Sequence, residues 1–199
     1  MIRRTAALAA LLAAGAIATW LALWPPMLVR SGSMSPTLLP GDLLLVRPLW
    51  PWEALPARGA VAAIHMPGGA IFLKRVAALP GETLQMRDGV LHLNGIPVPL
   101  EDVGQDGAPA FTTLARERLP GTPLYLIARP LLPSPLDDTP RLRAPPEHVL
   151  VLGDHRGHST DSRVQGGPGA VSRERIHGVA VAILLGPPGQ RLSRVGKMP

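Results

Sequence analysis

Prolines and glycines interrupt this chain so often that long helices have little room to form. The 199 residues include 24 prolines and 21 glycines. Proline lacks a backbone N–H donor, and glycine weakens the interior of helices and strands. Hydrophobic residues make up 46% of the chain, which is enough to build a packed core. The composition therefore predicts one mainly β domain of short strands and many turns.

Short apolar or alternating runs after Asp42 indicate where the strands lie. Asp88-Gly89 and Asn94-Gly95 separate three of these runs, and both dipeptides favour tight hairpins because glycine and asparagine tolerate positive φ. No helical period is long enough for a β-α-β unit, so we expect an antiparallel sheet. The predicted strands are residues 43–46, 60–65, 70–78, 83–87, 90–93, 96–98, 149–152 and 175–185.

Residues 5–24 form an uncharged stretch long enough to cross a membrane. Twenty residues at a rise of 1.5 Å span about 30 Å, the thickness of a bilayer core. Arg3 and Arg4 precede the stretch, and Trp20 and Trp24 lie near its far end. This arrangement predicts a single membrane helix with a cytoplasmic N-terminus. A cleaved signal peptide is the alternative, because small residues at 14–16 and 16–18 resemble cleavage sites.

The net charge indicates which partners the protein binds, and the lack of cysteine excludes some kinds of chemistry. The formal net charge of +6 favours anionic neighbours, either nucleic acid or phospholipid headgroups. The arginines are scattered and are not clustered with aromatic residues, so we expect contact with membrane phospholipid and none with nucleic acid. A chain without cysteine has no disulfides, no catalytic thiol and no cysteine metal site.

A loop with two hydroxyls precedes the first predicted strand. Ser31 and Ser33 flank a glycine, and Pro36 and Pro40 follow. Glycine permits a close backbone approach and proline restricts the chain, so residues 30–42 predict a shaped loop. The pattern alone fits either an ordinary turn or a nucleophile loop.

Lys74 is the second candidate because it lies inside an apolar run. Only two of the 20 basic residues are lysines, so an ordinary surface cation here would be arginine. Unlike guanidinium, an amine can lose its proton when it is buried. An unperturbed lysine needs roughly 4 to 5 kcal/mol to become neutral at pH 7, and the neighbouring side chains of Phe72 and Val76 offer the apolar surroundings that lower this cost. A lysine extending to solvent from a strand end is the alternative.

Three motifs in order, SGSMSPT, FLKRVAALPGE and LGDHRGHSTDSR, resemble the diagnostic boxes of bacterial type I signal peptidases. The resemblance runs from about Met27 to Val181. It implies an N-terminal transmembrane helix followed by an antiparallel β-sheet catalytic domain with a Pro-rich inserted region. The expected division is an anchor over residues 1–26, a peptidase domain over 27–185 with inserted hairpins and loops at about 100–146, and a flexible tail over 186–199.

The family resemblance also assigns roles to single residues. Ser33 is the nucleophile and Lys74 the general base of an acyl-enzyme mechanism. The Ser33 N–H and the Ser31 hydroxyl stabilise the oxyanion. Ser159 orients the lysine, and the structural support of the site comes from Gly153, Asp161 and Arg163. Neither a metal nor another cofactor is expected.

The implied substrates are secretory preproteins, cut at the signal peptide after small residues of the Ala-x-Ala type. The preprotein would lie extended against an edge strand. The expected location is the inner, cytoplasmic membrane, with a single pass and an extracytoplasmic catalytic domain. A specialised pilin or conjugation-type peptidase and a mitochondrial inner-membrane relative share the same boxes.

Two histidines depart from the family pattern and keep other interpretations open. The family usually has asparagine at the position of His155 and commonly also at the position of His158. It has an acidic turn where this chain has Arg58-Gly59. A triad of Ser33, one of these histidines and Asp154 or Asp161 is an alternative catalytic arrangement. Two histidines without a third ligand are weak evidence for a metal. A catalytically silent, membrane-tethered β-domain that binds a partner is the alternative from another class.

Overall fold

The computed structural model describes residues 15, 24, 26–190, 192–196 and 198. Strands dominate this part of the chain, with one short 3₁₀ helix, η1, at Arg173–Arg175. The mainly β, antiparallel class predicted from the sequence is confirmed. The strands are β1 (Pro26–Leu28), β2 (Leu43–Pro48), β3 (Val61–His65), β4 (Ile71–Ala78), β5 (Thr83–Arg87), β6 (Val90–Leu93), β7 (Ile96–Pro97), β8 (Leu100–Gly104), β9 (Thr112–Glu117), β10 (Tyr125–Pro130), β11 (Leu142–Arg143), β12 (His148–Leu152), β13 (Ala170–Ser172) and β14 (Ile176–Leu185).

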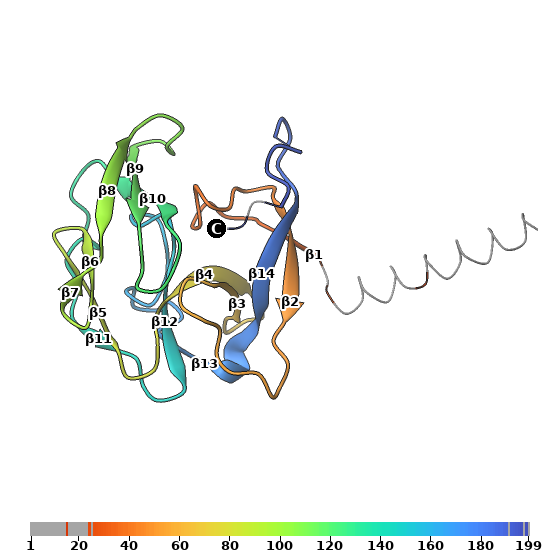
Figure 1. Cartoon of the computed structure of the whole chain (residues 1–199), viewed down its shortest axis with the longest axis horizontal. Helices are drawn as coiled ribbons and strands as arrows, with labels where there is room; N and C mark the ends of the chain where they lie inside the picture. Colours follow the sequence, from red (N-terminus) through yellow and green to blue (C-terminus); the bar gives the residue numbers. More distant parts are fainter. Residues whose placement is uncertain (1–14, 16–23, 25, 191, 197, 199) are drawn as a thin grey trace, which may run out of the picture.

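The strands form three antiparallel sheets. The largest has the order β1-β2-β14-β3-β4-β12-β13, and the smaller two have the orders β10-β9-β8 and β11-β5-β6-β7. In Figure 1 the two small sheets lie on one side of the molecule and β1, β2 and β14 on the other, with β3, β4 and β12 between them. Strand β4, which carries Lys74, therefore lies in the middle of the molecule, between the two small sheets and strands β1, β2 and β14.

The two predicted tight turns form the expected hairpins. Asp88 and Gly89 have φ values of 49° and 70°, and Asn94 and Gly95 have 53° and 83°. Positive φ at both central residues matches the twist of the flanking strands, which is why asparagine, aspartate and glycine are favoured there. Strands β5, β6 and β7 consequently form a local meander.

The inserted region, residues 100–146, contributes a sheet of its own and one further short strand. Strands β8, β9 and β10 pair with their neighbours in sequence and form antiparallel hairpins. Strand β11 instead joins the meander by pairing with β5. Tyr125 and Ile127 of β10 are buried in a core cluster together with Leu150 and Leu152 of β12. The insertion is thus packed onto the strand that leads into the third motif.

Pairing between distant strands brings the three motifs together. Strand β14 lies between β2 and β3, so the C-terminal part of the domain joins strands from its N-terminal part. Strand β12 pairs with β4, with Leu152 opposite Arg75. The end of β12 therefore delivers the loop at 153–163 to the side of Lys74.

The predicted membrane span lies outside the described residues, except for Gly15 and Trp24. Among the residues that are described, no helix has both the length and the apolar character needed to cross a bilayer. Near the other end of the chain, Arg194 pairs with the buried carboxylate of Asp42 at 2.7 Å and donates to the Thr37 carbonyl at 2.8 Å. The described part of the predicted tail thus contacts the loop that follows Ser33.

Candidate active site

The Ser33 hydroxyl and the Lys74 amine are in direct contact. Lys74 Nζ lies 2.8 Å from Ser33 Oγ and donates a second hydrogen bond, of 3.0 Å, to the Leu73 carbonyl. Forty-one residues separate the two side chains in sequence. The distance is within the range expected for a nucleophile and the base that activates it.

Burial changes the chemistry of Lys74. The residue is only 3% exposed, and Nζ lies 5.1 Å from the centre of the Phe72 ring. Desolvation lowers the pKa of Lys74 to about 8, although the negative charges of Asp161 and Asp154 raise it in part. At pH 7 about a tenth of the amine is then neutral, far more than for an unperturbed lysine, and this fraction can act as a general base.

Ser31 provides a second hydroxyl beside the nucleophile. Its Oγ lies 3.2 Å from Ser33 Oγ, and the residue is exposed at the surface of the loop. Pro36 and Met34 follow in the same loop, and Met34 is buried in a core cluster with Leu38 and Leu44. The loop is thus anchored in the core while its hydroxyls remain accessible.

Gly153 allows the third motif to pack against the nucleophile. A β-carbon at this position would collide with the Ser159 side chain and lie 2.5 Å from the Ser33 carbonyl oxygen. That carbonyl also accepts a 3.1 Å hydrogen bond from the His155 N–H. Ser159 is 6% exposed, and its hydroxyl has no hydrogen-bond partner within the described part of the chain. The loop therefore brings a buried hydroxyl close to Ser33, without a direct bond to Lys74.

Asp161 and Arg163 stiffen the same loop. Their side chains are fully buried and pair at 2.8 Å. Asp161 also accepts the Gly153 N–H at 2.9 Å, and Arg163 donates to the Arg156 carbonyl at 2.9 Å. Burial alone would raise the pKa of Asp161. The hydrogen bonds and positive charge of Arg163, together with the hydrogen bond from the Gly153 N–H, have the larger effect, so the pKa of Asp161 is lowered. A permanent negative charge therefore lies near Lys74.

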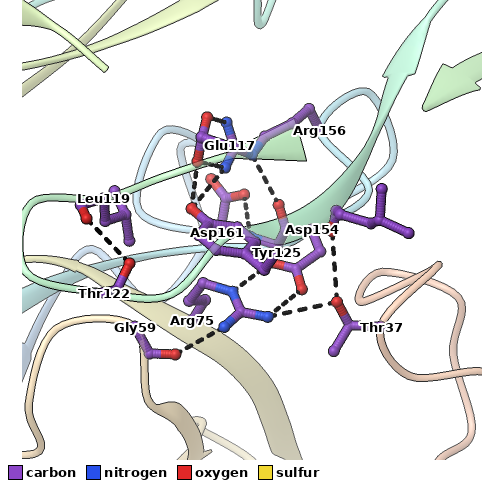
Figure 2. Close-up of polar contacts among 12 residues, drawn as sticks. Thr37, Gly59, Arg75, Glu117, Leu119, Thr122, Tyr125, Asp154, Arg156 and Asp161 are labelled. Carbon is purple, nitrogen blue, oxygen red and sulfur yellow. Dashed lines mark hydrogen bonds and ion pairs between the residues drawn. The ribbon is translucent and has the colours of Figure 1, made fainter. Parts of the chain in front are cut away.

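A second buried ion pair joins the lysine strand to the third motif. Arg75 pairs with Asp154 at 2.6 and 2.8 Å, and these side chains are 3% and 0% exposed. Figure 2 shows the same guanidinium reaching Gly59 and Thr37, and it lies 4.0 Å from the centre of the Tyr125 ring. Arg75 thus connects β4, the serine loop and the inserted sheet.

The inserted sheet supplies a third buried ion pair, which sequence reasoning missed. Arg156 holds the Glu117 carboxylate with both guanidinium ends, and the Tyr125 hydroxyl donates to the same carboxylate (Figure 2). Glu117 is 1% exposed and Arg156 4%. Backbone bonds from Ala128 to Asp154 and from Arg156 to Ala128 add a direct contact between β10 and the loop. No local pattern around Glu117 marks this role.

A cleft of about 980 Å³ opens above Ser33 and Lys74. The free edge of β1 and the residues after it form one side, and β4 forms another. Met34 of the serine loop lines the cleft, whereas Pro36 of the same loop lines a separate hollow of about 460 Å³. The cleft above Ser33 and Lys74 is lined by residues 27–31, 33, 34, 69–74, 136, 157–160 and 164.

The histidine triad is not assembled in this structure. Among the described residues, no imidazole is hydrogen-bonded to Ser33 Oγ, and Asp154 and Asp161 are bound by arginines. His155 and His158 contact each other, with ring centres 5.5 Å apart. No group of three or more potential metal ligands occurs within the described ranges. The geometry thus favours Lys74 over either histidine as the base.

Comparison with known proteins gives consistent matches. The family described as "Signal peptidase, peptidase S26" matches residues 2–185. Signal peptidase I of Pseudomonas aeruginosa is 30% identical over 193 residues, covering 85% of this chain and 68% of that protein. Signal peptidase I T of Bacillus subtilis is 31% identical over 159 residues, covering 79% and 72%. A crystal structure of a signal peptidase I from Enterococcus faecalis aligns with a TM-score of 0.37 and 26% identity, over 63% of this chain and 96% of that one.

The family match and the curated relatives show a serine endopeptidase. The chain belongs to the signal peptidase family, peptidase S26. The expectations that it is a signal peptidase and a serine endopeptidase are confirmed. The roles of the individual residues stay predictions.

Proposed function

We propose that this enzyme removes signal peptides by acyl transfer, with Ser33 as nucleophile and Lys74 as general base. The observation that carries the proposal is the 2.8 Å hydrogen bond between a buried amine and an accessible serine hydroxyl. Burial supports the assignment because it lowers the pKa of Lys74 to about 8. No other basic side chain in the described part is hydrogen-bonded to Ser33 Oγ.

The catalytic cycle follows from this pair. Neutral Lys74 removes the Ser33 proton while the serine oxygen attacks the scissile carbonyl, and an oxyanion develops. The Ser33 N–H and the Ser31 hydroxyl, 3.2 Å from Ser33 Oγ, are positioned to stabilise that charge. The Lys74 ammonium then protonates the leaving amine. A water molecule, deprotonated by Lys74, hydrolyses the acyl-enzyme and releases the signal peptide.

Ser159 and its loop act on the base indirectly. In this proposal the Ser159 hydroxyl, which has no other partner in the described structure, orients the amine when a substrate fills the cleft. Gly153 makes room for that hydroxyl, and the Asp161–Arg163 pair holds the loop in place.

In this proposal the preprotein lies extended along strand β1, at the side of the cleft. Strand β1 is an edge of the large sheet and pairs only with β2 among the described strands, so its other side is free to bind a substrate backbone. Backbone pairing accepts many sequences, and Ile71 and Leu73 line the cleft with apolar side chains, which suit small apolar residues of the substrate. This supports cleavage after Ala-x-Ala sites.

Residues 5–24 would anchor the enzyme in the inner membrane, with the N-terminus in the cytoplasm and the catalytic domain outside. Preproteins crossing the membrane would then meet the cleft next to the phospholipid surface. A peptidase dedicated to a few substrates, such as pilins, would use the same site. A general signal peptidase should restore growth to cells that lack their own housekeeping enzyme, whereas a dedicated peptidase should not.

The test compares the wild type with Ser33→Ala and Lys74→Arg, each as full-length enzyme in detergent, on a preprotein with an Ala-x-Ala site. Lys74→Arg keeps the positive charge but removes the neutral amine. Both variants should lose cleavage while retaining the fold by circular dichroism. Ser193→Ala, an exposed serine outside the cleft, is the matched control and should remain active.

Other outcomes would change the assignment. An active Lys74→Arg variant would place the base elsewhere and return attention to the histidines. An inactive but folded wild type would favour a partner-binding domain.

A further inference from the structure

The charged groups that line the cleft are all basic. Of the side chains around it, Arg30, Lys74 and His158 are the ones that can carry charge, and no aspartate or glutamate is among them. Lys74 has to be neutral to act as a base. Arg30 and His158 therefore determine the electrostatic character of the cleft toward a substrate.

No carboxylate neutralises either group within the described structure. Arg30 is exposed and makes no ion pair there, whereas eight other arginines do. His158 is also exposed, and its ring lies against the imidazole of His155. The two nearby acids in the third motif, Asp154 and Asp161, are fully buried and already bound to Arg75 and Arg163.

Both groups line the same cleft as Ser33 and Lys74, and each directly precedes a serine of the proposed site. Arg30 directly precedes Ser31, between the end of β1 and the nucleophile. His158 directly precedes Ser159, whose loop packs against the Ser33 carbonyl. A peptide that lies along β1 and crosses Ser33 would pass both side chains.

Building on the proposed peptidase function, we propose that Arg30, assisted by His158, makes the cleft prefer preproteins that carry an acidic side chain close to the scissile bond. Opposite charges attract across the partly solvated cleft, and a basic side chain in the same place is repelled. Because the groups are exposed, the preference is modest and salt-dependent. We expect roughly a 3- to 10-fold higher kcat/KM for glutamate than for lysine at low salt.

The experiment uses full-length enzyme in detergent and a set of fluorogenic peptides with one Ala-x-Ala site. Glutamate, glutamine or lysine is placed either at x or at the first position after the cut. The readout is the glutamate-to-lysine ratio of kcat/KM within each enzyme, which is independent of overall activity. The ratio should exceed one for the wild type at one position at least, and should fall toward one as salt is added.

Three substitutions in the enzyme show which side chain causes the preference for glutamate, and a fourth serves as the control. Arg30→Gln should lower the ratio and Arg30→Glu should invert it. His158→Asn should lower the ratio less than Arg30→Gln does, because His158 only assists Arg30. Arg141→Gln removes another exposed arginine without an ion pair in the described structure, outside the cleft, and should leave the ratio unchanged.

The outcomes separate this inference from the proposed function. Equal rates on all three peptides, or a preference that Arg30→Glu leaves intact, would overturn the charge selection while the peptidase assignment stands. Failure of the folded wild type to cut even the glutamine peptide would overturn the peptidase proposal and this inference with it.

Discussion

Gly153 and Ser159 lie so close together that no side chain larger than hydrogen fits at position 153. A β-carbon there would also press on the Ser33 carbonyl oxygen, 2.5 Å away. The close contact couples the third motif to the nucleophile, because the Ser33 carbonyl is held by the His155 N–H of the same loop. The distance between Ser33 and Lys74 therefore depends on how this loop is packed.

Gly153→Ala should accordingly impair catalysis more than stability. A displacement of about 1 Å at a reacting group costs on the order of 10²-fold in rate, whereas overpacking costs about 1 to 3 kcal/mol. The measurement is kcat on the Ala-x-Ala preprotein together with the free energy of unfolding from urea titration. A variant with wild-type kcat would mean that the loop does not set the position of Ser33.

The pH dependence of cleavage should follow the Lys74 amine. Burial lowers its pKa to about 8, and only the neutral amine can accept the Ser33 proton. The rate should therefore rise with pH through about 8 and level off above it. Initial rates between pH 6 and 10 under kcat/KM conditions give the profile for the free enzyme. A profile with its midpoint near 6.5 and no change around 8 would point to an imidazole base.

Removing the Ser31 hydroxyl should slow the reaction without abolishing it. Ser31→Ala should lower kcat by about 10²- to 10³-fold, the usual cost of losing one oxyanion donor. Ser33→Ala should show no acyl transfer at all, since the attacking oxygen is gone. Single-turnover kinetics on the same preprotein compare the two variants. If Ser31→Ala were the inactive one, the assignments of nucleophile and helper would have to be exchanged.

Features encoded in short windows were predictable from the sequence. The hairpins at Asp88-Gly89 and Asn94-Gly95 follow from residues that tolerate positive φ, and the structure has positive φ at each. Lys74 could be singled out because lysine is rare in this chain and occurs within an apolar strand. The Phe72 ring lies over its amine as expected, with the ring centre 5.1 Å from Nζ.

Features that depend on distant pairing were not predictable. Strand β14 inserts between β2 and β3, and no local pattern specifies that order. Strand β1 has three residues, too few for a recognisable alternation. Glu117 and Arg156 are 39 residues apart, and their pairing arises only when the inserted sheet packs on β12.

The Glu117–Arg156 pair should be worth far more to stability than an exposed pair in the same sheet. Glu117→Gln leaves a buried guanidinium without its counter-charge, and breaking a buried pair in this way costs about 3 to 5 kcal/mol. Glu101→Gln is the matched control, because Glu101 pairs with Arg116 at 3.4 Å while 66% exposed, and exposed pairs contribute about 0 to 1 kcal/mol. Urea titration of both variants measures the difference. An equal loss of unfolding free energy in the two variants would mean that water reaches Arg156. The inserted sheet would then not hold the loop at 153–163 through this ion pair.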